Sequence, residues 1–137
     1  MNRRLILTLF ASVAFATAAA AQSPPGKVRL YFISPQDGET VSSPVTVRFG
    51  LSGMGVAPAG VEKENTGHHH LLIDTDLPKM DEPIPVDAKH LHFGGGQTET
   101  NLTLPPGQHT LQLLLGNWTH VPFNPPVVSE KITVTVK

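Results

Sequence analysis

The chain has 137 residues, a length typical of a single ordinary domain. Its 10 basic and 11 acidic residues give a net charge of −1, which argues against nucleic-acid binding, because phosphate contacts need a surplus of Lys and Arg. The 13 Pro and 12 Gly exclude a helix bundle and favour short strands joined by turns.

Residues 1–21 are typical of a secretory signal peptide. Arg3 and Arg4 precede an apolar run that extends to Phe15, and three alanines ending at Ala21 form a small-residue cleavage pattern. The run is too short, and too close to the cleavage pattern, to predict a membrane span. We expect a processed protein in the periplasm or outside the cell, with a short linker at residues 22–27 and one domain at residues 28–137.

Cysteine is absent from the chain, so neither a disulfide nor a lipid anchor on a cysteine is expected. Apolar burial must then hold the core together. The expected partners are a metal ion or an unknown component of the cell envelope, and not nucleic acid.

Apolar residues recur at every second position from Val45 to Leu51, which predicts a half-buried strand. Similar runs predict strands at residues 28–33, 67–74, 98–104, 109–115 and 128–136. Residues 75–96 are interrupted by three prolines and leave room only for a short strand around residues 84–86. Six or seven short strands without a helical period favour a single all-β domain, an immunoglobulin-like antiparallel β-sandwich, with a small barrel as the alternative.

Three long segments of the chain resemble a known family. The segments GVEKENTGHHHLLID, HFGGGQTET and LPPGQHTLQLLLGNWTHVP are similar to a secreted bacterial family catalogued as domain of unknown function 4399. The resemblance covers roughly residues 28–136. It implies no activity, so the function has to be inferred from the residues.

The chain has seven histidines, many for a sequence with so few charged residues. With the strands in immunoglobulin order, the start of strand 67–74, the segment before strand 98–104 and the loop after strand 109–115 meet at one end of the sandwich. Six histidines are therefore expected at that end: His68, His69, His70, His90, His92 and His120. His109 is expected at the opposite end, where it would hydrogen-bond back to the backbone as a corner tyrosine does.

Two H-x-H pairs suggest a metal site, because residues i and i+2 of a strand share a face. We expect His69 to point inward and His68 and His70 to face the loops. Imidazole without thiolate favours Cu(II), Zn(II) or Ni(II) over Ca or Mg, and copper is the first choice on affinity order. The predicted ligands are His68, His70, His92 and His120, with His90 and His69 in reserve.

Other residues near the expected site have secondary roles in this interpretation. Carboxylates that could orient a ligand ring are Glu62, Glu64 and Asp74. Two methionines, Met54 and Met80, could serve Cu(I) but are more often gap fillers. The glycines at 94–96 permit a close approach of the backbone or an anion nest.

Three functions are consistent with this pattern. The first is non-catalytic binding of copper or another divalent metal. The second is an envelope interaction module in which the histidines form a structural hydrogen-bond network. The third, a small metalloenzyme with Glu62 or Glu64 as base, is the least favoured, because no H-E-x-x-H motif places a base beside the ligands.

Overall fold

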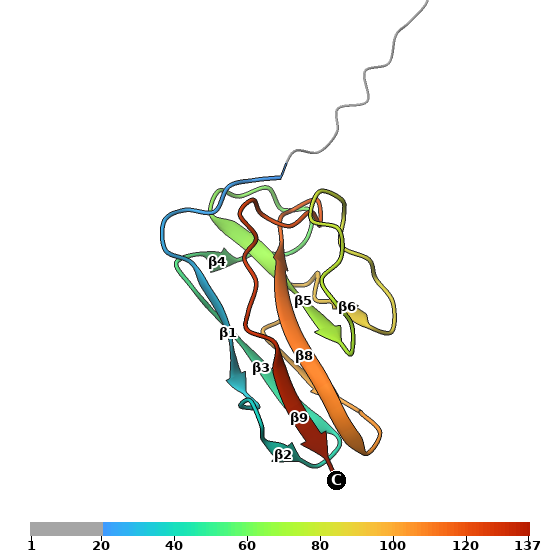
Figure 1. Cartoon of the computed structure of the whole chain (residues 1–137). Helices are drawn as coiled ribbons and strands as arrows, with labels where there is room; N and C mark the ends of the chain where they lie inside the picture. The colour runs from blue at the N-terminus through green and yellow to red at the C-terminus, as the bar shows by residue number, and fades with distance from the viewer. Residues whose placement is uncertain (1–20) are drawn as a thin grey trace, which may run out of the picture.

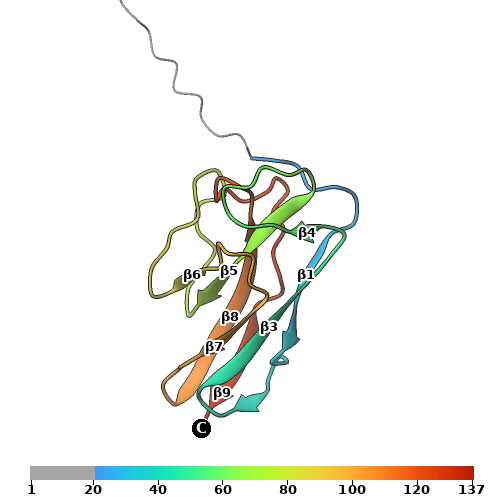
Figure 2. The ribbon, with the colours of Figure 1, turned by 180° about the vertical axis from the view of Figure 1, so that it is seen from behind.

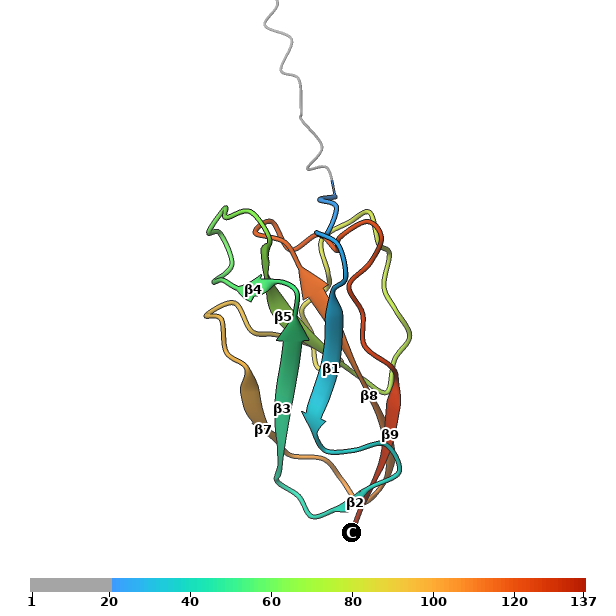
Figure 3. The same cartoon turned by 90° about the vertical axis from the view of Figure 1, so that its left-hand side faces the viewer.

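The computed structural model describes residues 21–137, which form two β-sheets packed face to face. Figure 3 shows the smaller sheet in front of the larger one. The predicted signal peptide lies outside the described residues, apart from Ala21. Among the described residues, no helix has the length and apolarity needed to cross a membrane. The predicted all-β sandwich is confirmed, while its immunoglobulin-like type stays a prediction.

The three-stranded sheet has the order β1-β3-β7. Its members are β1 (Arg29–Ser34), β3 (Val45–Ser52) and β7 (Glu99–Leu102). All of its pairings are antiparallel. This sheet covers one side of the core and contributes no histidine.

The larger sheet has the order β2-β9-β8-β5-β4, and β6 also pairs with β5 (Figures 1 and 2). Its members are β2 (Thr40–Val41), β4 (Gly55–Val56), β5 (Thr66–Ile73), β6 (His90–His92), β8 (Gly107–Gly116) and β9 (Ile132–Val136). Strand β5 has β8 along one edge, and β4 and β6 at successive positions along the other. Strand β5, which carries three of the histidines, is therefore an interior strand with neighbours along both edges.

The main core lies between the two sheets and is built by alternating positions, as the period of two predicts. Strand β3 contributes Val47 and Phe49, β8 contributes Leu113, and β9 contributes Val134. A second, smaller cluster of buried apolar residues lies apart from this core and consists of Leu72, Ile84 and Leu114. Both faces of the larger sheet are thus covered around β5.

Two strand predictions are corrected. Residues 84–86 form no strand, and the strand of this segment is β6 instead. The flanking Pro83 and Pro85 have no N–H to give to a ladder, and the N–H of Ile84 donates to the carbonyl of His120 at 2.9 Å. The last strand begins at Ile132 rather than residue 128, where only an isolated bridge joins Val128 to Leu114.

Candidate metal centre

The three consecutive histidines of β5 divide between the two faces of the larger sheet. His69 points into the main core, where its ring centroid lies 5.1 Å from that of Phe49. His68 and His70 point to the other face, on the side of the second apolar cluster. The predicted parity of this strand is therefore observed, and both outward histidines are nevertheless 0% exposed. Loops cover the face that they occupy.

Strand β6 brings a third histidine to this outer face. His92 lies directly opposite His70 in the antiparallel pairing of β6 with β5. Directly paired residues share a face, so the two side chains meet, with ring centroids 5.0 Å apart. The ring of His92 is also 5.0 Å from that of His68.

His120 reaches the same place from the turn that follows β8. Its ring centroid is 4.9 Å from that of His92, 5.1 Å from that of His68 and 6.4 Å from that of His70. The backbone of His120 has a φ of 70°, in the left-handed region that non-glycine residues rarely adopt. Such a conformation persists only where the surroundings hold it, and it is common at functional sites.

Asn117 holds that turn in shape. Its side chain is 1% exposed, and its Oδ1 accepts hydrogen bonds from the backbone N–H groups of Thr119 and Val121 and from the Thr119 hydroxyl. The N–H of His120 in turn donates to the backbone carbonyl of Asn117 at 2.9 Å. Sequence reasoning missed this role, although Asn is a common turn residue whose side chain can hydrogen-bond the backbone two residues further on.

We call the four rings of His68, His70, His92 and His120 the histidine centre. One nitrogen from each of the first three lies within 4.8 Å of the other two, close enough for small ring rotations to bring them onto one ion. The nitrogens of His120 fall outside this set of three. The centre therefore offers three converging ligands and a fourth ring beside them.

Most nitrogens of the histidine centre have no hydrogen-bond partner among the described residues. This holds for both ring nitrogens of His68 and of His70 and for Nε2 of His92. A buried polar atom without a partner costs about 1–3 kcal/mol, so folded proteins rarely keep several together without a use for them. His69 also has two unpaired nitrogens, but it faces Phe49 on the other side of the sheet.

Burial and mutual repulsion keep these imidazoles neutral. Burial, and then the neighbouring imidazoles, lower the pKa of His68 to about 4 and the pKa of His70 to about 2. The pKa of His92 is also lowered, chiefly by burial and then by His120. At pH 7 these rings carry free lone pairs, which is the form that binds a metal ion.

Two glycines let the rings pack against the backbone. A Cβ at Gly94 would lie 2.8 Å from Nε2 of His92, and a Cβ at Gly116 would lie 2.9 Å from Cε1 of His70. Real Cβ atoms essentially never come so close, so a side chain at either position would displace a ring. The close backbone approach expected of the glycines at 94–96 is found at Gly94. The need for Gly116 was not foreseen.

His90, a reserve ligand in the prediction, does not join the centre. It pairs with Leu72, one step further along the β5–β6 ladder, and its Nδ1 lies 2.8 Å from a carboxylate oxygen of Asp87. The same oxygen accepts from the N–H of His90. These two contacts hold the ring of His90 beside Asp87 and not among the rings of the centre.

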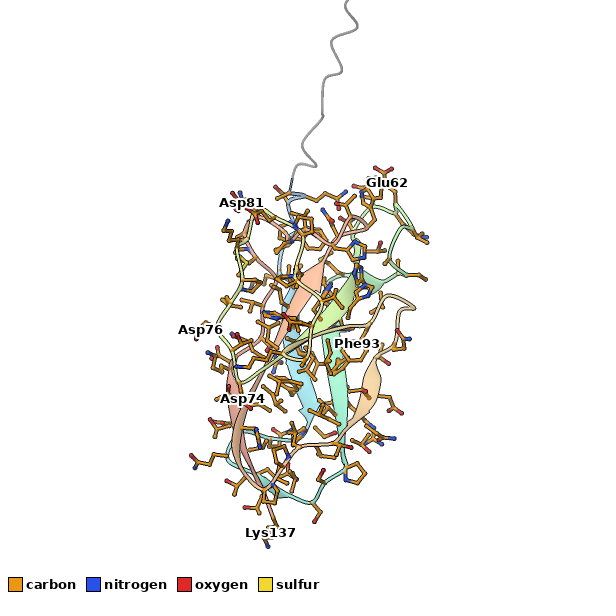
Figure 4. The ribbon with its side chains drawn as sticks, turned by 90° about the vertical axis from the view of Figure 1, so that its right-hand side faces the viewer. Glu62, Asp74, Asp76, Asp81, Phe93 and Lys137 are labelled. Carbon is orange, nitrogen blue, oxygen red and sulfur yellow. The ribbon has the colours of Figure 1, made fainter. Side chains whose placement is uncertain are left out.

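The carboxylates predicted to orient a ligand lie elsewhere. Asp74 binds His109, with 2.7 Å between its Oδ2 and the ring Nδ1. Glu62 and Glu64 are exposed, and Figure 4 shows Glu62 at the end of the molecule and Asp74 well below it. Among the described residues none of the three carboxylates is hydrogen-bonded to an unpartnered nitrogen of the centre, so the role predicted for them is not observed.

The other secondary predictions have clear outcomes. His109 does hydrogen-bond back to the backbone, with its Nε2 2.8 Å from the carbonyl oxygen of Pro105. Met54 packs against the main core and Met80 against the second apolar cluster, as gap fillers do.

Comparison with known proteins gives one match. The model of a family described as Domain of unknown function (DUF4399) matches residues 47–137, a range that contains all four rings of the histidine centre. No curated protein and no solved structure matches the chain.

Proposed function

The chain belongs to the DUF4399 family, whose description assigns no activity, and from the histidine centre we propose that it is an exported, non-catalytic protein that binds a transition-metal ion. The ion is copper or another divalent transition metal that prefers imidazole nitrogen as a ligand. Its ligands are His68, His70 and His92, with His120 as the fourth.

The unpaired ring nitrogens are the observation that carries this proposal. If the histidines served only to hold the loops through hydrogen bonds, their nitrogens would have carbonyl, carboxylate or imidazole partners. Five nitrogens of His68, His70 and His92 have none among residues 21–137. A bound ion would give each of these rings a partner, and this favours metal binding over a purely structural network.

The donor set indicates the class of metal. It consists of imidazole alone, without thiolate or carboxylate, which suits Zn, Cu or Ni and not Ca or Mg. Among these divalent ions, copper binds most tightly to a given nitrogen site. Copper is therefore the first candidate.

A binding role fits the surroundings better than catalysis. His68 and His70 are fully buried, whereas the two glutamates considered as a base, Glu62 and Glu64, are exposed to solvent. A metal hydrolase needs an open coordination position and a base within hydrogen-bond reach of it. Here the position beside the three converging nitrogens is occupied by the ring of His120.

The first test is metal uptake by the untagged chain. We expect one ion per chain with a dissociation constant below about 10 μM in calorimetric titrations with Cu(II) and Zn(II). His92→Ala should weaken binding at least tenfold, whereas His109→Ala, which removes a histidine outside the centre, should leave it unchanged. The proposal fails if neither of these ions, nor Cu(I) kept reduced and free of oxygen, binds more tightly than about 10 μM.

Export is proposed from residues 1–21, which are typical of a signal peptide. The native protein should then be recovered outside the cytoplasm with an N-terminus near Gln22. A mass spectrum showing the unprocessed chain in the cytoplasm would contradict this part of the proposal and would leave metal binding standing.

A further inference from the structure

We infer that the histidine centre selects a monovalent ion, Cu(I), over divalent ions, because no carboxylate belongs to the group of ligand side chains that residues 21–137 bring together there. This inference rests on the proposed metal binding and goes further by naming the charge of the ion. It concerns the oxidation state in which copper is held.

The ligand set is electrically neutral. The group of metal-binding side chains around the three converging nitrogens contains histidines only, with no carboxylate. The nearest candidates in sequence are committed elsewhere, since Asp74 binds His109 and Asp87 binds His90. A dication bound here would keep its full charge of +2, and a monocation its charge of +1.

The apolar surroundings make a buried charge energetically unfavourable. His68 and His70 are 0% exposed, and Leu72, Ile84 and Leu114 form an apolar cluster on the same face of the sheet. The free energy needed to move an ion from water into such a place rises with the square of its charge. The penalty for a dication is therefore about four times that for a monocation of the same size.

A dication could recover part of this penalty by binding a hydroxide or chloride at an open coordination position. The ring of His120 stands beside the three converging nitrogens, 4.9 Å from the ring of His92 and 5.1 Å from that of His68. Its turn is fixed by the buried side chain of Asn117. An anion would have to displace this ring, whereas Cu(I) is satisfied by three neutral nitrogen ligands.

Cu(I) and Zn(II) make a suitable pair of probes, because both are d¹⁰ ions without a geometric preference from their d electrons and differ in charge. The affinity of the untagged chain for each is measured by competition with a chromophoric chelator, with Cu(I) kept reduced and free of oxygen. Each affinity is compared between wild type and two variants at one position.

The variants are His120→Asp and His120→Asn. Both residues tolerate the left-handed backbone found at position 120, and they have nearly the same shape, so they differ in one negative charge. A carboxylate near the ion stabilises a dication about twice as much as a monocation. The ratio of Zn(II) to Cu(I) affinity should therefore be at least about tenfold higher in His120→Asp than in His120→Asn.

We expect the wild-type chain to bind Cu(I) more tightly than Zn(II), and the added carboxylate to shift the ratio toward Zn(II). Wild-type binding of Zn(II) as tight as that of Cu(I), or an equal ratio in the two variants, overturns the charge preference and leaves metal binding standing. Uptake of neither ion by the wild type overturns the proposed function and this inference together.

Discussion

Gly94 lies against the imidazole of His92, two residues earlier in the chain, so closely that a Cβ at position 94 would stand 2.8 Å from Nε2 of that ring. Nε2 is buried and has no hydrogen-bond partner within residues 21–137. The backbone of Gly94 also accepts a hydrogen bond from the N–H of Ala59 at 2.8 Å, so it is not free to retreat. The position of the His92 ring therefore depends on the absence of a side chain at residue 94.

Gly94→Ala should displace the His92 ring and weaken metal binding by about 10–100-fold, the usual effect of losing a group that supports a metal ligand. Gly95→Ala is the matched control, because the atoms nearest to a Cβ there belong to the flexible side chain of Gln97. Neither glycine has a positive φ, so backbone strain does not distinguish the two variants. Calorimetric titration of both variants checks this, and equal affinities would contradict the placement of His92 as a ligand.

Asn117→Ala should loosen the turn that carries His120. The substitution leaves the N–H groups of Thr119 and Val121 without their acceptor. Because Asn117 is only 1% exposed, water cannot easily replace that acceptor, and the unfolding free energy should fall by about 1–3 kcal/mol. Metal affinity should fall as well, because the fourth ring loses its support. Asn101→Ala, which removes an exposed asparagine of β7, should change neither quantity in urea unfolding and metal titration.

The long strands could be predicted from the sequence because their apolar residues alternate with a period of two. The cores of β3 and β8 were found in this way, each within two residues of its observed bounds. The short strands β2, β4 and β6 were not found, because two or three residues contain no measurable period. Such strands form where a neighbouring strand offers a free edge, and this depends on the folded chain.

For the histidines, too, the sequence predicts what depends on alternation within one strand but not what depends on how two strands pair. Parity along β5 predicts that His68 and His70 share a face, since it depends only on alternation within one strand. The difference between His92 and His90 could not be predicted, because it depends on which residue of β5 each one opposes. The inclusion of His120 depends on a turn with positive φ, which its sequence signals only weakly.

The contact of His109 with Asp74 predicts a pH-dependent contribution to stability. Nδ1 of His109 faces the Asp74 carboxylate and Nε2 faces a carbonyl oxygen, so both nitrogens must donate and the ring must be charged. The hydrogen bond to Asp74 raises the pKa of His109 above its ordinary value of 6.5. The contribution of charged His109 to the unfolding free energy is therefore complete below pH 6.5, and it is lost as the pH rises through the raised pKa.

The Asp74 carboxylate contributes to stability with the opposite pH dependence, because its pKa is lowered and not raised. Burial raises the pKa of Asp74, but the hydrogen bonds from His109 and Thr110 outweigh burial and lower it below 3.8. The contribution of the carboxylate is thus present above pH 3.8 and disappears as the pH falls through the lowered pKa. Asp74→Asn should cost up to about 1 kcal/mol at pH 6 and less at pH 9 in urea unfolding. Asp76→Asn, at a fully exposed carboxylate, should show no such trend.

The neutral rings of the histidine centre predict that the metal-free protein loses stability in mild acid. In the unfolded chain, His68 and His70 take up protons near pH 6.5, whereas in the folded chain their pKa values are about 4 and about 2. The unfolded state therefore binds more protons below pH 6.5, and the unfolding free energy should fall by roughly 1 kcal/mol per pH unit for each ring. Urea unfolding between pH 4.5 and 7.5 in the presence of a chelator measures this slope.

Removing the metal at constant pH measures how much a bound ion stabilises the folded protein. An ion that binds only the folded state stabilises it by about 3 kcal/mol when its free concentration is a hundred times its dissociation constant, so adding a chelator should lower the unfolding temperature. Protons compete with the ion for the same nitrogens, so this difference should shrink as the pH falls below 6.5. His68→Gln should reduce both the acid slope and the chelator effect, because it removes one buried imidazole from the centre. Equal unfolding temperatures with and without saturating metal would show that the unpaired nitrogens of the folded protein bind no ion.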